Sequence, residues 1–133
     1  MRELTKAESE IMQILWEKGN AFVQDIIDDM PEPKPAYNTV STIVRILEQK
    51  AMVAHEPFGR SHRYFPLVKK EKYTRSFMRN IMDSYFENSF PKMVSFFARQ
   101  ENLSVHELEE IKQMVERKLN EKTSKKPKKS HRK

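Results

Sequence analysis

Apolar residues recur at helical spacing along the first 50 residues, in three successive segments. Thr5 and Glu8 have the spacing of a capping box and predict the start of a first helix, which Gly19 ends. A second, shorter helix is predicted over residues 22–30. Three prolines within residues 31–35 cannot continue that helix, and they stiffen the turn into the next one. These segments predict a helix-turn-helix arrangement.

The third segment, residues 36–51, has two chemically different faces. Its apolar positions predict a stripe that packs on a core: Val40, Ile43, Val44 and Leu47. The opposite face carries hydrogen-bonding groups and one guanidinium: Asn38, Ser41, Thr42, Arg45 and Gln49. Glu48 is the only acid in the segment. Such a face can reach base edges and phosphates from a major groove, although an ordinary surface helix has the same pattern.

Two short segments after this helix predict a β-hairpin. We expect strands over residues 51–56 and 62–67, joined by a turn that contains Pro57 and Gly59. Donors suited to phosphates gather near the tip: Arg60, His62 and Arg63. A surface turn with a few cations is common, so the hairpin is weak evidence by itself. Helix, short helix, turn, helix and hairpin is nevertheless the order of a winged helix-turn-helix.

Large apolar side chains dominate the second half of the chain. A long helix is predicted over residues 69–88, then a short one with Pro91 in its first turn, and a last one that Ser104 and Glu107 open as a capping box. Their apolar faces are wide and aromatic: Tyr73, Phe77, Ile81, Tyr85, Phe96, Phe97, Leu108, Ile111 and Val115. About 50 residues cannot easily bury so many such groups within one chain, so pairing with a second copy is expected. The alternative is that this face packs on the winged helix of its own chain.

The pattern as a whole predicts a mainly α fold with a small β-hairpin, in three parts. We expect an N-terminal winged-helix DNA-binding domain over residues 1–68, a C-terminal helical dimerisation domain over 69–121, and a disordered basic tail over 122–133. Residues 1–68 hold eight Lys and Arg against ten Asp and Glu, whereas the last twelve residues hold seven cations and no acid. The tail either adds sequence-independent attraction to DNA or only solubilises the protein.

The net charge of +6 therefore does not by itself indicate a DNA-reading domain. The DNA hypothesis depends on the order of the elements and on cations that act locally. These cations are Lys34, Arg45, Lys50, Arg60 and Arg63.

Composition excludes several classes of function. The chain has no cysteine, which excludes disulfides, thiolate zinc sites and thiol redox switches. Its apolar runs are far shorter than the ~20 residues of a membrane span, and the N-terminus lacks a signal peptide, so we expect a cytoplasmic protein without membrane insertion. The four histidines have no metal-ligand spacing, and no phosphate loop or nucleophile motif is visible. We therefore expect no enzyme activity, catalytic residue, cofactor or metal.

Four separated motifs resemble the penicillinase repressor family, called BlaI/MecI. They are LTKAESEIMQILWEKG, AYNTVSTIVRILEQK, GRSHRYFPL and ENLSVHELEEI, and the resemblance runs from about residue 4 to residue 119. It implies a bacterial transcriptional repressor that is a homodimer through its C-terminal helices. Such a repressor binds a dyad-symmetric operator in double-stranded DNA with one winged helix from each subunit. It is released when a membrane-bound sensor system triggers cleavage of the dimerisation segment, which implies a sensor-linked protease as a partner.

The resemblance also implies roles for particular residues. Those expected in the major groove are Asn38, Ser41, Thr42 and Arg45. Those expected at phosphates near the helix ends are Tyr37, Thr39 and Lys50. The wing tip is expected to consist of Gly59, Arg60 and Ser61. Tyr37 can equally be a core or capping aromatic residue, and Thr39 can equally be only a cap.

Two positions depart from the family's pattern. Where relatives tend to have glycine after the recognition helix, this chain has Ala51, so the helix exit lacks the residue that favours left-handed backbone. In the best-known resistance repressors the cleaved bond follows an asparagine, whereas the equivalent pair here is Phe96 and Phe97. A different protease or a different signal can therefore relieve repression. Copper-responsive relatives with C-terminal cysteine pairs are excluded, because this chain has no cysteine.

A second hypothesis comes from a different class of function. The chain could be a winged-helix protein–protein interaction module without an operator, in which the acidic first part meets a basic partner. The two hypotheses differ in the sign of the electrostatic potential around Arg45 and Arg60, which must be positive for DNA.

Overall fold

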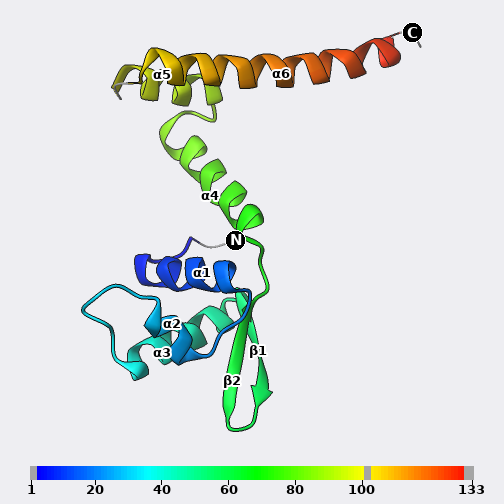
Figure 1. The fold of residues 1–133 in the computed structure, drawn as a ribbon. Helices are drawn as coiled ribbons and strands as arrows, with labels where there is room; N and C mark the ends of the chain where they lie inside the picture. Colours follow the sequence, from blue (N-terminus) through cyan, green and yellow to red (C-terminus); the bar gives the residue numbers. More distant parts are fainter. Residues whose placement is uncertain (1–2, 101–102, 131–133) are drawn as a thin grey trace. The chain divides into compact units, whose positions relative to one another are not determined.

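The structure is a computed structural model that describes residues 3–100 and 103–130. By their internal contacts the elements divide into two compact units, Met1–Tyr85 and Phe86–Lys133. The first unit consists of α1 (Lys6–Lys18), α2 (Val23–Asp28), α3 (Tyr37–Gln49), β1 (Val53–Phe58), β2 (Ser61–Pro66) and α4 (Lys70–Tyr85) (Figure 1). The second consists of α5 (Phe90–Gln100) and α6 (Val105–Ser130). None of the helices in the described ranges combines the length and the apolar character that a membrane crossing requires.

The first unit is a winged helix, which confirms the predicted fold class. α1 begins with the predicted capping box: Thr5 N–H donates to Glu8 at 2.9 Å, and Glu8 N–H donates to the Thr5 hydroxyl at 3.2 Å. Gly19 ends this helix with a φ of 86°, and its N–H donates to the Leu15 carbonyl at 2.8 Å.

α2 is shorter than the helix predicted over residues 22–30. It spans Val23–Asp28, and the following N–H groups of Asp29 and Met30 turn tightly onto carbonyls three residues back. The ammonium of Lys34 donates to the carbonyls of Ile27, Asp28 and Met30 at 3.3, 3.0 and 2.7 Å. A cation at a helix C-terminus satisfies carbonyls that have no helical partner. Lys34 thus ends α2 and fixes the proline-rich turn that leads into α3.

The core of this unit joins the three helices to the hairpin. The predicted stripe of α3 faces it: Val40, Val44 and Leu47 are fully buried, and Ile43 packs against them. The other fully buried large side chains are Ile11, Met12 and Leu15 of α1, Ile26 of α2 and Val53 of β1. Because the stripe of α3 is covered, the opposite face of that helix has to point away from the core.

The two strands have the predicted length but are shifted toward the tip, and the turn between them is tighter than the sequence predicted. β1 and β2 pair antiparallel over their whole length, which leaves Gly59 and Arg60 for the turn. Gly59 has a φ of 64°, a conformation that favours glycine. Pro57, predicted to lie in the turn, is instead part of β1. Among the described residues β1 pairs only with β2, so its other edge has no partner that would require an N–H from proline.

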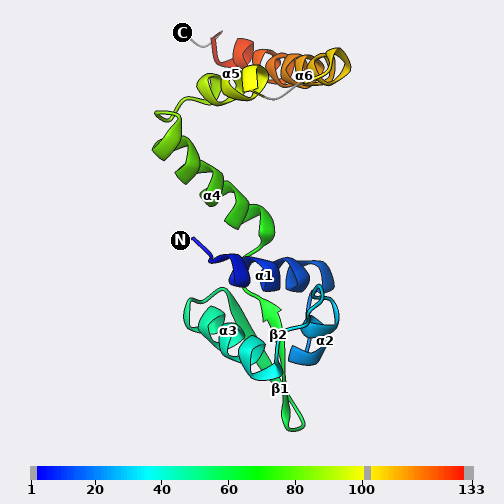
Figure 2. The same cartoon turned by 90° about the vertical axis from the view of Figure 1, so that its left-hand side faces the viewer.

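Two contacts tie the hairpin to the start of α2. Ala21 and Tyr64 exchange backbone hydrogen bonds of 2.9 and 2.8 Å. The rings of Phe22 and Phe58 meet edge to face, with centroids 5.7 Å apart. The hairpin is therefore held beside the helices, and in both views its tip extends beyond them (Figures 1 and 2).

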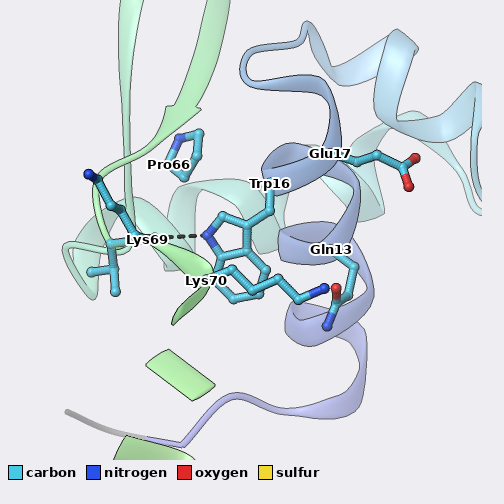
Figure 3. Close-up of a pocket in the computed structure, with 7 residues that line it drawn as sticks. Gln13, Trp16, Glu17, Pro66, Lys69 and Lys70 are labelled. Carbon is cyan, nitrogen blue, oxygen red and sulfur yellow. Dashed lines mark hydrogen bonds between the residues drawn. The ribbon is translucent and has the colours of Figure 1, made fainter. Parts of the chain in front are cut away.

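α4 is attached to the first unit by its N-terminal half. Trp16 Nε1 donates to the Val68 carbonyl at 2.8 Å, and Figure 3 shows the indole between the end of β2 and the start of α4, at an open hollow of about 450 Å³. Leu4 N–H donates to the Tyr73 hydroxyl at 2.9 Å, and the ring of Tyr73 lies 5.9 Å from those of Trp16 and Phe77. In both views α1 lies between α4 and α3 (Figure 2).

This attachment differs from two expectations. Tyr73 is 9% exposed and belongs to the core of the first unit, and Phe77 packs against that core, although both were assigned to a dimer interface. For Tyr73 the alternative of packing on the winged helix is the one observed, whereas Phe77 is only partly buried and its place in a dimer interface stays a prediction. The first unit extends to Tyr85, beyond the boundary expected at residue 68, because Tyr73 at the start of α4 is buried in its core and Phe77 packs against that core.

The second unit has two capped helices. Lys92 N–H donates to the Ser89 hydroxyl at 3.2 Å at the start of α5. Ser104 and Glu107 form the predicted capping box at the start of α6, with hydrogen bonds of 3.0 and 3.1 Å. α6 continues to Ser130, whereas the sequence predicted no ordered structure from residue 122. Lysine, which is frequent in this segment, is a good helix former. The rest of that tail, residues 131–133, lies outside the described residues.

The chain just after α3 has left-handed backbone, the conformation that glycine favours and that was expected from the sequence at this position. Ala51 has a φ of 62°, and Met52 N–H donates to the Leu47 carbonyl at 3.0 Å. An L-residue with a Cβ is strained in this left-handed region by about 1–2 kcal/mol.

We expect Ala51→Gly to stabilise the protein by about 0.5–1 kcal/mol, because it removes this strain at some cost in unfolded-state entropy. Urea unfolding followed by circular dichroism would measure the change. Ala54→Gly, the same chemical change inside β1, should have the opposite sign, since glycine weakens a strand. Equal destabilisation by both variants would contradict the explanation.

Candidate nucleic-acid interface

The exposed face of α3 carries the residues that the sequence predicted for a major groove. Asn38, Thr42 and Arg45 are exposed, and Ser41 is partly exposed. Arg45 Nε lies 3.5 Å from the Ser41 carbonyl, and no ion pair engages its guanidinium among the described residues. The structure therefore brings these four side chains together on one helix, with donors and acceptors directed away from the core.

Tyr37 and Thr39 lie at the start of α3. The Tyr37 side chain is 54% exposed, so it is not a core aromatic residue. Thr39 lines a small hollow of about 240 Å³ beside Pro31, Pro33 and Pro35. No side chain caps this helix end; Ala36 is the N-cap residue, and its first turn contains no acid. The first-turn N–H groups and the positive end of the helix dipole are thus not neutralised by a capping carboxylate.

Glu48, the one acid of α3, is turned toward the hairpin. Its Oε2 lies 2.6 Å from Nδ1 of His55 on β1, and the His55 ring stacks on His62 of β2 with centroids 4.0 Å apart. This contact joins α3 to both strands. It also keeps the only carboxylate of the helix away from the face that carries Arg45.

The tip of the hairpin presents Gly59, Arg60 and Ser61, as predicted. Arg60 has no ion pair within the described residues, whereas Arg63 is compensated: its Nε donates to Glu56 at 3.0 Å, and its guanidinium lies 4.6 Å from the Phe58 ring centre. Of the two arginines near the tip, Arg60 is therefore the one with an uncompensated charge.

Lys50 and Lys34 have structural roles that the sequence did not reveal. The Lys50 ammonium lies 2.8 Å from both carboxylate oxygens of Glu8, and its side chain is only 18% exposed. Lys34 is engaged by the carbonyls at the end of α2. Both had been counted among the cations available to phosphates, but their ammonium groups point to partners within the fold. A buried acid 42 residues from the lysine gives no local signal from which this could have been read.

The buried Glu8–Lys50 pair alters the protonation of the carboxylate. Burial raises the pKa of Glu8, but hydrogen bonds from Lys50 and Thr5 outweigh it and hold the pKa below the ordinary value of 4.5. Glu8 is therefore ionised at neutral pH, and the two charges neutralise each other inside the first unit.

Sequence reasoning also missed Ile46, an apolar residue of α3 that is 38% exposed. The sequence contains a signal for it: Ile46 is apolar but lies outside the i, i+3, i+4, i+7 series that starts at Val40, so it does not belong to the buried stripe of the helix. In the described part of the chain, no three His, Cys, Asp or Glu side chains gather in a group that could hold a metal ion.

Comparison with known proteins gives a consistent result. Residues 4–117 match the family model of the penicillinase repressor. The methicillin resistance regulatory protein MecI of Staphylococcus aureus (strain N315) is 26% identical over 117 residues, which cover 87% of this chain and 95% of that protein. The penicillinase repressor of Bacillus licheniformis is 22% identical over 121 residues, 90% of this chain and 94% of that one.

A solved structure is also similar, with a TM-score of 0.46 and 22% identity. It is the solution structure of monomeric Bacillus licheniformis BlaI in complex with the blaP half-operator, and the likeness covers 54% of this chain and 89% of that chain.

We expect Glu8→Gln to lower the free energy of unfolding at pH 7 by about 2–3 kcal/mol, because it leaves a largely buried ammonium without its carboxylate. The pKa of Glu8 is lower in the folded state, so its contribution is fully present above pH 4.5 and is lost as the pH falls through the folded-state pKa. The difference between wild type and variant should therefore shrink below pH 4.5.

Urea unfolding at a series of pH values would measure this difference. Glu10→Gln, which removes an exposed acid of the same helix, is the matched control and should leave stability nearly unchanged. A Glu8→Gln effect that stayed constant down to pH 3 would show that the ion pair contributes nothing to stability.

Proposed function

Because the chain belongs to the penicillinase repressor family, we propose that it is a DNA-binding transcriptional repressor that reads its operator with α3 and acts as a homodimer. The observation that carries this proposal is the exposed face of α3. It combines Asn38, Thr42 and Arg45 without a carboxylate, on a helix whose other side is fully packed.

The local charges support DNA as the ligand of this face. Although acids outnumber Lys and Arg in residues 1–68, three acids of this unit are engaged: Glu48 contacts His55, Glu56 binds Arg63, and Glu8 binds Lys50. Arg45 and Arg60 remain with uncompensated charge among the described residues. A groove-facing helix and a cationic wing tip on one rigid unit can contact bases and backbone at the same time.

The second unit supports the homodimer. Within residues 86–99 and 103–124 no side chain of this unit is buried. Its exposed apolar side chains include Phe96, Phe97, Leu108, Ile111 and Val115, with exposed fractions between 38% and 57%. Two helices with so much uncovered apolar surface need a partner, and a second copy provides the same surface by symmetry.

A homodimer also explains how such a small reading unit could select an operator. One winged helix contacts few base pairs, but a linked pair makes the second contact intramolecular and raises the affinity without new contacts. We expect a dyad-symmetric operator with half-sites one helical turn, or a multiple of it, apart.

Release by cleavage would need an opening of α5. The Phe96–Phe97 bond lies within this helix, and the ring of Phe96 contacts the rings of Phe86 and Phe97 at 5.7 and 5.6 Å. A helical backbone does not fit an extended protease cleft until it unfolds locally. The sensor-linked protease and the inducing signal remain predictions.

The first test is binding of the full-length protein to fragments of its own upstream region and to random DNA across a salt series. We expect tight binding to one fragment. Arg45→Ala should lower affinity for that fragment by about 1–3 kcal/mol if it reads a guanine, whereas Arg60→Ala should weaken both DNAs alike and reduce the salt slope by about 1. Arg75→Ala on α4 is the matched arginine control.

Two results would contradict this proposal. The first is equal, weak binding to both DNAs that vanishes with salt and with removal of residues 122–133, which would leave the basic tail as the DNA contact. The second is no DNA binding at all, which would favour the protein-interaction module.

The homodimer is tested separately by sedimentation equilibrium. Ile111→Asp should shift the protein toward the monomer, because it places a charge among apolar side chains that would be buried between copies. Lys112→Asp, one residue along the same helix, is the control and should leave association nearly unchanged. Identical association of both variants would contradict an interface on this face of α6.

A further inference from the structure

One apolar side chain lies on the exposed side of α3. Ile46 is 38% exposed, whereas Val40, Val44 and Leu47 are fully buried. Among the described residues, neither the core cluster nor the partly buried side chains that pack against it include Ile46. Packing within the first unit therefore does not explain an isoleucine at this position.

Helical spacing places Ile46 beside the polar side chains of the same face. Thr42 lies four residues before it and Gln49 three residues after it, and both are exposed. Side chains at these spacings are neighbours on a helix surface. A surface that contacts Thr42 and Gln49 therefore also meets Ile46.

The chemistry of the side chain limits what it can recognise. Isoleucine has no hydrogen-bond donor or acceptor, so it cannot read the polar edges of a base pair. The methyl group of thymine is the apolar feature on the floor of the major groove, and apolar side chains recognise it by contact.

We propose that Ile46 is a specificity-determining residue that contacts a thymine methyl group in each half-site of the operator. This inference rests on the proposed function, because it requires α3 to lie in the major groove. It assigns a T·A pair to the half-site position that faces the C-terminal half of α3, where Ile46 lies between Thr42 and Gln49.

Deoxyuridine is the probe, because it differs from thymidine only by the missing methyl group. The full-length protein would first select sites from a library of random duplexes, and each thymine of the selected half-site would then be replaced in turn. We expect one position at which the replacement weakens binding of wild type about fourfold per half-site, the value of one buried methyl group. At that position the Ile46→Ala protein should show no further loss.

Matched variants separate this contact from its neighbours. Thr42→Ser removes a methyl group from the adjacent turn, and Leu67→Ala removes an aliphatic side chain that is 53% exposed but lies outside α3. Both should keep the uracil penalty at the assigned position. Ile46→Val, a smaller change with little effect on folding, should show a reduced penalty, and circular dichroism would check that each variant is folded.

The outcomes distinguish this inference from the function on which it rests. The inference would be overturned if wild type and Ile46→Ala showed the same loss of affinity on uracil substitution at every position of the selected sequence. It would also be overturned if the loss disappeared in Thr42→Ser instead. Either result would leave DNA reading by α3 intact. Failure of wild type to select any sequence would overturn the proposed function itself.

Discussion

The ion pair between Glu8 and Lys50 connects the first turn of α1 to the residue that ends α3, and the direction of α3 depends on this junction. The carboxylate accepts both from Lys50 and from the N–H of Thr5, so one side chain caps α1 and holds the exit of the other helix. Both charges are largely buried, and each is stable there only while the other is present. Together with the buried stripe of Val40, Val44 and Leu47, the pair leaves α3 one orientation, in which its polar face points outward.

The same arrangement explains how the winged helix can present a positive surface to DNA although its sequence contains more acids than Lys and Arg. Glu8 and Glu56 lie in ion pairs, and Glu48 is directed at the hairpin by its contact with His55. Electrostatic recognition depends on the charges that face the ligand, not on the sum over the domain. The net charge of residues 1–68 therefore underestimates how well this surface can bind DNA. The better indicator is that neither Arg45 nor Arg60 has an ion-pair partner among the described residues.

The helices, both capping boxes and the winged-helix order were predictable, because local spacing and capping chemistry encode them. The hairpin register and the place of Pro57 were not, since they depend on which strand edge lacks a partner. Lys34 and Lys50 were misread for a related reason. Each is a cation in a plausible DNA-facing segment, and only the fold places carbonyls or a buried carboxylate against it. Tyr73 fits an aromatic dimer stripe in sequence, but its ring contacts Trp16 and its hydroxyl accepts from Leu4 N–H within the first unit instead.

The two units differ in how their stability arises, and this difference bears on regulation. The winged helix has its own core, whereas none of the described side chains of α5 and α6 is buried. In the proposed homodimer, the fold of the second unit would therefore depend on association, and its stability would rise with protein concentration. Any event that opens α5 would then remove the link between two reading units, and each would keep its fold but lose the gain from intramolecular binding. Repression could thus be relieved without any change at α3, through loss of avidity alone.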